Sequence, residues 1–129
     1  MNAQRTRYKD IIAEATAASS DVTSTTFEMK HYRHLSIMLV HTSINNNSGA
    51  FIIEGSLDGT LWDIINTHYV IIDEPTDGYA SVDGYYSPDA DSSRELIMMD
   101  HVTVPFLRVR WEAKTVTVGT VQVQISAVS

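Results

Sequence analysis

The sequence predicts an all-β protein: an antiparallel β-sandwich of jelly-roll type with a short N-terminal helix or arm. β-Branched residues fill 37 of the 129 positions, as 12 Val, 12 Ile and 13 Thr, and such side chains favour the pleated surface of a strand. The C-terminal third alternates apolar and polar residues, as in a sheet with one face in water. Seven or eight short apolar runs also recur at the 8–12 residue spacing of sandwiches and jelly rolls.

The length and composition exclude several classes of protein. A chain of 129 residues makes one folded domain, which we divide into a helix or arm over residues 1–24 and a sandwich over 25–129. A formal charge of −7 argues against nucleic acid as a partner. No apolar run reaches the roughly 18 residues that a membrane helix needs, no apolar core of a secretory signal follows the first residues, and there is no cysteine.

The N-terminal segment has the apolar spacing of an amphipathic helix. Tyr8, Ile11, Ile12 and Ala15 stand at i, i+3, i+4 and i+7, and no Gly or Pro interrupts them. A helix of about 14 residues is marginal alone in water, so it needs a partner surface. That surface is either its own sandwich or a neighbouring subunit, and the residues leave both open.

The strands follow from the apolar runs. We expect strands over residues 25–30, 33–43, 50–56, 61–72 (with a break near 66–67), 94–99, 105–113 and 120–128. Residues 33–43 are apolar on both faces, which predicts a central strand covered on two sides. Residues 73–100 hold eight acids against one base, which favours a long acidic loop with at most one short strand before 94–99.

The most specific stretch runs from Ser56 to Trp62, with Asp58 and Gly59 between them. Asp-Gly supplies the conformational freedom of a tight turn, and Trp62 begins the returning segment as a large anchor. This Ser-x-Asp-Gly-x-x-Trp run resembles a hairpin found in β-sandwich proteins of tailed-phage virions. It is also similar to the hairpin of discoidin-type, galactose-binding-like domains.

The resemblance implies a small virion structural protein of the capsid decoration (cement) type. Such a protein is located on the capsid surface, binds major coat protein subunits and forms a homo-oligomer, expected here to be a trimer. In this family type an N-terminal arm reaches a neighbouring subunit, and basic residues in an acidic chain suit an acidic partner. The expected interface residues are Arg5, Arg7, Tyr8, Ile11 and Ile12.

No motif for catalysis or for a cofactor occurs in the sequence, so we expect a protein that is not an enzyme and has no cofactor. The five histidines lack ligand spacing and are expected at surface or edge positions, so no metal site is predicted. Calcium binding by the acidic segment stays open, although Arg94 stands where a calcium loop needs glycine.

Alternative functions remain. A carbohydrate-binding or adhesion module would use aromatic side chains as a stacking platform, and a neck or tail connector would use the same sandwich. Against the platform, the tryptophans are expected in the core and the tyrosines at loop ends or in an interface. The candidate platform residues are Trp62, Tyr79, Tyr85, Tyr86 and Trp111.

Overall fold

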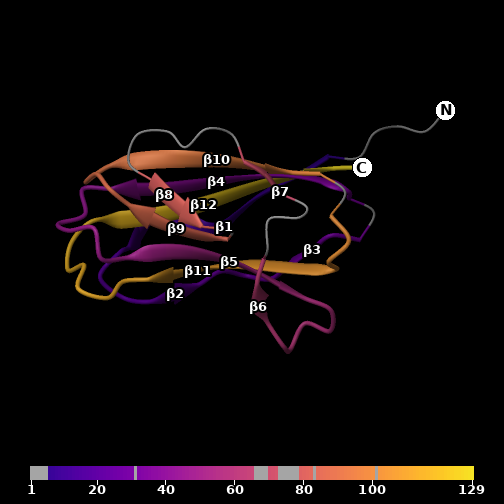
Figure 1. The fold of residues 1–129 in the computed structure, drawn as a ribbon, viewed down its shortest axis with the longest axis horizontal. Coiled ribbons are helices and arrows are strands. Elements are labelled where there is room, and N and C mark those ends of the chain that lie inside the picture. The colour runs from indigo at the N-terminus through magenta and orange to yellow at the C-terminus, as the bar shows by residue number, and fades with distance from the viewer. Residues whose placement is uncertain (1–5, 31, 66–69, 73–78, 83, 101) are drawn as a thin grey trace.

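The protein is a sandwich of two antiparallel sheets packed face to face (Figure 1), which confirms the all-β, two-sheet prediction. The computed structural model describes residues 6–30, 32–65, 70–72, 79–82, 84–100 and 102–129. No helix occurs in this described part, and so none there has the length and hydropathy to cross a membrane. The strand order does not establish jelly-roll connectivity, which stays a prediction.

Sheet 1 has five strands, all paired antiparallel with their neighbours. In spatial order they are β1 (Thr6–Ala17), β12 (Thr120–Val128), β4 (His34–Thr42), β10 (Ser93–Met99) and β7 (Val70–Ile72). The strand predicted over residues 33–43 is therefore central, with β12 on one side and β10 on the other.

Sheet 2 has seven strands built around β11 and β5. In spatial order they are β2 (Val22–Thr23), β11 (Phe106–Glu112), β5 (Ala50–Ser56), β9 (Tyr85–Pro88) and β8 (Tyr79–Val82); β3 (Phe27–Glu28) also pairs with β11, and β6 (Asp63–Ile64) with β5. The two strands predicted over 50–56 and 105–113 thus lie side by side in one sheet.

The core lies between the sheets and is filled by every second side chain. Alternation of buried and half-buried residues runs along the whole of β11 and β12, as their period of two predicts. Trp111 is fully buried, with its ring centroid 4.8 Å from that of Phe51, and its indole Nε1 donates a hydrogen bond of 2.9 Å to the carbonyl of Ala18. A Cβ at Gly49 would lie 2.5 Å from the Trp111 ring, so this corner requires glycine.

The N-terminal helix prediction is wrong. Residues 6–17 form β1, an edge strand of sheet 1 paired with β12. The pairing register shifts between Asp10 and Ile12 and again between Ile12 and Thr16, so β1 contains β-bulges, which place extra residues opposite a single partner. As a result the adjacent Ile11 and Ile12 are both buried, at 4% and 3% exposure. A bulged strand and a helix can therefore bury the same two neighbouring residues.

The acid-rich segment contains more regular structure than the sequence predicted. β8 and β9 pair antiparallel, and β9 joins sheet 2 through β5, so two strands precede β10 where at most one was expected. Gly84 allows a close approach between β9 and β5: its carbonyl accepts from Ile53 N at 2.8 Å, and a Cβ on it would lie 2.8 Å from the Ile53 carbonyl oxygen.

The segment predicted as one strand over residues 61–72 is divided between the two sheets. β6 pairs with β5 in sheet 2, whereas β7 pairs with β10 in sheet 1. The expected break near 66–67 lies outside the described residues. The chain therefore crosses from one sheet to the other within this segment.

Residues 33–43 were expected to be covered on both faces of the strand, and this prediction is wrong for one of the two faces. Leu35, Ile37 and Leu39 face sheet 2 and are at most 2% exposed. Met38 and Val40 face away from sheet 2 and stay half-buried. The sandwich therefore leaves one apolar face of this strand partly open to solvent.

Candidate interaction surfaces

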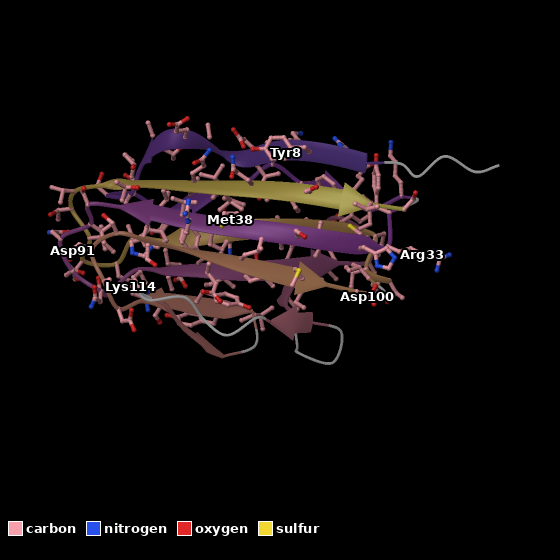
Figure 2. The ribbon with its side chains drawn as sticks, turned by 90° about the horizontal axis from the view of Figure 1, so that it is seen from above. Tyr8, Arg33, Met38, Asp91, Asp100 and Lys114 are labelled. Carbon is pink, nitrogen blue, oxygen red and sulfur yellow. The ribbon has the colours of Figure 1, made fainter. Side chains whose placement is uncertain are left out.

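The outer face of sheet 1 is a continuous surface made by alternate side chains of four strands. Figure 2 shows this face, with Tyr8 on β1 and Met38 on β4. Strand register sets its rows: Asp10, Gln124, Met38 and Leu96 are successive partners across β1, β12, β4 and β10. The central part of this face comprises Tyr8, Asp10, Ser36, Met38, Val40, Arg94, Leu96, Met98, Gln122, Gln124 and Ser126. Glu14 lines a hollow on the same side together with Val40, Thr42, Thr120 and Gln122.

Some side chains with large apolar surfaces on this face are accessible to solvent. Tyr8 is 61% exposed, Leu96 37% and Met98 38%. The Tyr8 hydroxyl donates to Asp10 Oδ1 at 3.3 Å and accepts from the Gln124 amide, so the ring is held by two neighbours. Desolvation, followed by the Asp10 carboxylate, raises the pKa of Tyr8 above its usual value of 10.0, so the hydroxyl is protonated at neutral pH.

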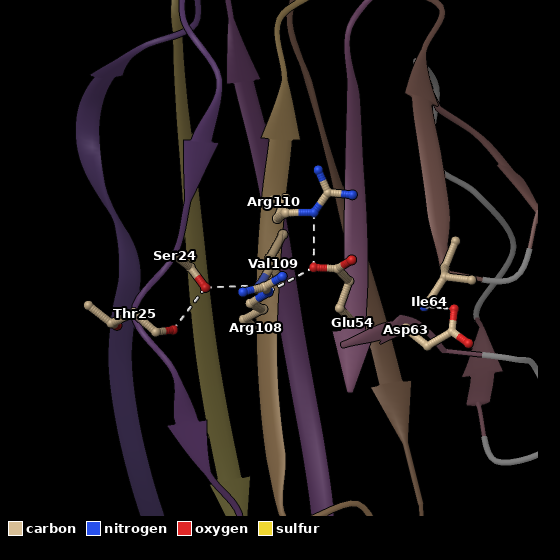
Figure 3. Close-up of polar contacts among 8 residues, drawn as sticks. All are labelled: Ser24, Thr25, Glu54, Asp63, Ile64, Arg108, Val109 and Arg110. Carbon is tan, nitrogen blue, oxygen red and sulfur yellow. Dashed lines mark hydrogen bonds and ion pairs between the residues drawn. The ribbon is translucent and has the colours of Figure 1, made fainter. Parts of the chain in front are cut away.

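The outer face of sheet 2 carries a charged cluster instead (Figure 3). The Nε atoms of Arg108 and Arg110 both donate to Glu54 Oε1, at 2.8 and 2.9 Å. The Glu54 side chain is 10% exposed, against 24% and 33% for the two arginines. The Arg108 guanidinium also lies 4.2 Å from the centroid of the Trp62 ring. Two cations thus share one carboxylate, which leaves one net positive charge in this cluster.

The turn between β5 and β6 positions Trp62. Asp58 Oδ1 accepts from the backbone N–H groups of Thr60 and Leu61 at 2.8 and 2.9 Å, and from Ser56 Oγ at 3.0 Å. These bonds lower the pKa of Asp58 from its usual 3.8, with the Leu61 and Thr60 amides as the leading causes. Gly59 has a φ of 80°, which confirms the predicted role of the Asp-Gly pair in a tight turn.

One end of the sandwich is held by a buried histidine. His41, at the end of β4, is 1% exposed, and its Nε2 is 2.8 Å from the Ala90 carbonyl oxygen in the β9–β10 turn. Burial lowers the pKa of His41 from its usual 6.5, although the Ala90 carbonyl, Asp89 and Asp91 oppose that shift. The expectation that histidines lie at surface or edge positions is therefore wrong for His41.

Ionisable groups elsewhere form a pair at the opposite end. His34 Nδ1 and an Asp100 carboxylate oxygen are in contact, and both side chains are about half exposed. They line a hollow of about 290 Å³ together with Ser36 and Met98. Among the described residues no group of three or more His, Cys, Asp or Glu side chains is arranged to hold a metal ion.

The structure separates the residues expected at the partner interface. Arg5 lies outside the described residues. Arg7 has its guanidinium 4.9 Å from the centroid of Phe27, and Tyr8 is exposed on the outer face of sheet 1. Ile11 and Ile12 are in the core and have little area to offer another chain. The role of these residues in binding a partner stays a prediction.

The aromatic residues considered as a sugar platform do not gather on one surface. Trp111 and Tyr86 are both fully buried, as the core interpretation predicted for Trp111. Trp62 is half-buried against Arg108, so its expected place in the core is wrong. The Tyr85 hydroxyl accepts from Lys114 Nζ at 2.8 Å, and the Tyr79 side chain lies outside the described side chains.

Met38, Leu96 and Met98 are surface residues that the sequence alone does not predict. The signal that could have predicted them is the strand over 33–43, which is apolar on both faces. In a sandwich of two sheets only one of these faces can be covered by the other sheet, so the second face is left on the surface. In the strand over 94–99, Leu96 and Met98 alternate with the buried Ile97 and Met99, but the sequence alone does not say which set faces inward.

The full chain resembles one solved structure in fold. The crystal structure described as SPBc2 prophage-derived protein YomS matches with a TM-score of 0.53, covering 100% of this chain and 97% of that one at 14% sequence identity. At this identity the likeness shows a shared fold and nothing finer. No protein-family model and no curated protein sequence matches the chain.

Proposed function

We propose that this chain is a non-enzymatic structural protein of a phage particle, a capsid decoration (cement) protein that binds the coat lattice. The observation that carries the proposal is the full-length fold similarity to a protein described as prophage-derived. The turn from Ser56 to Trp62, which resembles a hairpin of virion sandwich proteins, supports the same assignment. So does a fold whose partly open sheet face can pack against another protein.

The proposed mechanism is binding alone. A decoration protein adds buried surface between coat subunits on the outside of the shell, and that surface opposes the internal pressure of the particle. Several copies in one homo-oligomer, which we propose to be a trimer, attach at once, so avidity multiplies weak contacts. Jelly-roll connectivity belongs to the same proposal.

The basic N-terminal segment is the proposed contact with the coat. Arg5, Arg7 and Lys9 are three cations in a chain of net charge −7, and a local cluster of this kind steers docking to an acidic surface at low salt. Tyr8, on the same strand, adds an exposed ring. Ile11 and Ile12 contribute indirectly, by anchoring β1 in the sandwich.

Electron microscopy of particles with and without the chain tests the location. We expect additional density on the outer capsid surface only when the chain is present. Density confined to the neck or tail would reject the decoration role in favour of a connector. A selective hit on a glycan array, together with no binding to capsids, would reject it in favour of a carbohydrate-binding module.

Point substitutions test the contact better than truncation, because deleting residues 1–20 would remove β1 and two core isoleucines. The double variant Arg5→Glu/Arg7→Glu should bind capsids at least tenfold more weakly at low salt, since both changes replace attraction with repulsion. The matched control is Lys30→Glu/Arg33→Glu, which changes the net charge equally and should bind as the unaltered chain does. Equal losses in both variants would contradict the assigned contact.

A further inference from the structure

The β5–β6 turn, residues 57–62, carries the two most exposed large apolar side chains among the described residues. Leu57 is 80% exposed and Leu61 is 77% exposed. Figure 1 shows the turn projecting beyond the sandwich, and neither leucine belongs to the core. A single exposed leucine is ordinary on a protein surface, but two on one short turn form a larger apolar contact area.

Hydrogen bonds within the turn fix its backbone. Ser56 Oγ accepts from the backbone N–H groups of Asp58 and Gly59, at 3.3 and 2.9 Å. Asp58 Oδ1 accepts from those of Thr60 and Leu61, at 2.8 and 2.9 Å. The two leucines are thus held in place before any partner arrives, which lowers the conformational entropy that binding costs.

The charges beside the leucines favour a protein pocket over a lipid surface. Residues 56–63 include two carboxylates, Asp58 and Asp63, and no Lys or Arg. Segments that bind at a membrane surface combine apolar residues with Lys and Arg, which attract anionic lipid headgroups. Two leucines flanked by carboxylates instead match a pocket of a protein that is apolar at its base and basic at its rim.

The basic segment proposed to contact the coat needs an apolar contact of this kind. Its charges steer docking, whereas a few anchors that become buried supply most of the affinity of an interface. Ile11 and Ile12 cannot be such anchors, because both are already buried in the sandwich.

The start of β1 and the β5–β6 turn are connected by contacts at one end of the sandwich. The Arg7 guanidinium lies 4.9 Å from the centroid of Phe27, and Phe27 pairs with Leu107. The next side chain on β11 is Phe106, whose ring is 3.8 Å from where a Cβ on Gly59 would lie. One partner can therefore contact both the basic segment and the turn.

We propose that Leu57 and Leu61 insert together into an apolar pocket with a basic rim on the coat protein, as a second contact beside the basic segment. This inference rests on the proposed function, because that function supplies the partner. The leucines contact the coat and not another copy of the chain, so the proposed trimer forms without them.

Cosedimentation of the full chain with capsids tests the contact. Leu57→Gln/Leu61→Gln should bind at least about tenfold more weakly, since burial of both apolar side chains is lost. The loss should persist at about 1 M salt, where charges are screened beyond roughly 3 Å. The controls are Val118→Gln, at an apolar side chain that is 51% exposed on another turn, and Thr60→Gln, between the two leucines. Both should bind as the unaltered chain does, and thermal melts should show every variant folded.

A fluorescent label gives a second measurement that does not depend on affinity. The chain has no cysteine, so Leu57→Cys creates a single attachment site for a thiol-reactive dye that is sensitive to its surroundings. The emission should shift to the blue when capsids are added, because the dye enters an apolar pocket. The same dye attached to Val118→Cys should show no shift.

The outcomes separate this contact from the proposed function. A double leucine variant that binds capsids as the unaltered chain does, or a dye at residue 57 that shows no shift on bound capsids, would overturn the contact alone. An unaltered chain that binds no capsid would reject the proposed function and the contact with it. A changed oligomeric state of the double variant in sedimentation velocity would assign the leucines to contacts between copies. Binding of the unaltered chain to vesicles of phosphatidylcholine and phosphatidylglycerol would assign them to lipid, and either result would overturn the contact.

Discussion

At the scale of single residues, Glu54 organises the outer face of sheet 2. Its Oε1 accepts from two arginines that stand two residues apart on β11, and one of those arginines stacks on Trp62. Hydrogen bonds between charged groups are stronger than neutral ones, and removing one partner of a partly buried set leaves the others uncompensated. The carboxylate therefore stabilises more of this face than a single exposed ion pair would.

Replacing Glu54 should be costly. We expect Glu54→Gln to lower the free energy of unfolding by about 2 kcal/mol, because the glutamine amide oxygen can still accept N–H groups but cannot neutralise the charges of Arg108 and Arg110. Urea unfolding measures the difference. Glu28→Gln, at a half-exposed pair with Lys30, is the matched control and should change stability by less than about 0.5 kcal/mol. Similar losses in both would contradict this role.

His41 predicts an acid dependence of stability. Its pKa is lowered in the folded protein from the usual 6.5, so below that pH the unfolded chain binds more protons than the folded one. Stability is therefore full above pH 6.5 and falls as the pH drops toward the folded pKa. Thermal melts between pH 7.5 and 5 should show this fall, and His41→Gln should reduce it. His34→Gln, at a half-exposed position, should keep it.

At the scale of elements, β1 is a segment whose secondary structure depends on the strand beside it. The register shift between Asp10 and Ile12 buries Ile11 and Ile12 together, and in the second shift Ala15 takes a positive φ of 63°. Bulges also distort an edge strand so that it is a poor template for further pairing. The irregular pairing of β1 therefore has two effects: it buries both isoleucines in the core, and it makes the edge of the sheet less able to pair with another strand.

Truncating Ile11 separates a core role from a surface role. We expect Ile11→Ala to lower the free energy of unfolding by about 3 kcal/mol, as large-to-small changes in a core do. Val118→Ala, at a side chain that is 51% exposed, should change it by less than about 0.5 kcal/mol. Measured by urea unfolding at low protein concentration, equal effects would mean that Ile11 does not pack inside the folded monomer.

At the scale of the whole molecule, Trp111 connects distant parts of the chain. It packs on Phe51 of the adjacent strand β5, bonds to the Ala18 carbonyl at the corner between β1 and β2, and leaves no room for a side chain at Gly49. Because β1 is in sheet 1 and β2 in sheet 2, this corner is where the chain first crosses the sandwich.

The two tryptophans offer a matched test of that connection. Trp111→Phe should cost about 2 kcal/mol, since it removes both a buried hydrogen bond and part of a close-packed ring. Trp62→Phe, on the outer face, should cost less than about 1 kcal/mol. Its remaining tryptophan emission should be blue-shifted, as expected for a buried indole. A smaller loss at Trp111 than at Trp62 would contradict the assignment.

Much of the fold could be predicted from local patterns. The alternation along β11 and β12, and the Asp58-Gly59 turn, are decided by side-chain period and by backbone conformational freedom, which are properties of neighbouring residues. The candidate surfaces could not be predicted in this way. Asp10, Met38 and Arg94 share one face only because β12 and β4 lie between β1 and β10, and that order depends on pairings between residues far apart in the sequence.

The sequence by itself determined that the chain forms stacked antiparallel sheets. Apolar residues that recur at every second position lie on one face of a strand, whereas in a helix they would not lie on one face. Only the tertiary structure decided that residues 6–17 form a strand along β12 rather than an α-helix. Both conformations bury Ile11 and Ile12, but the strand also satisfies the backbone hydrogen bonds along the edge of β12. Tertiary structure likewise decided which of the two apolar faces of β4 packs on sheet 2 and which remains partly open to solvent. In a sandwich of two sheets, sheet 2 can cover only one face of sheet 1.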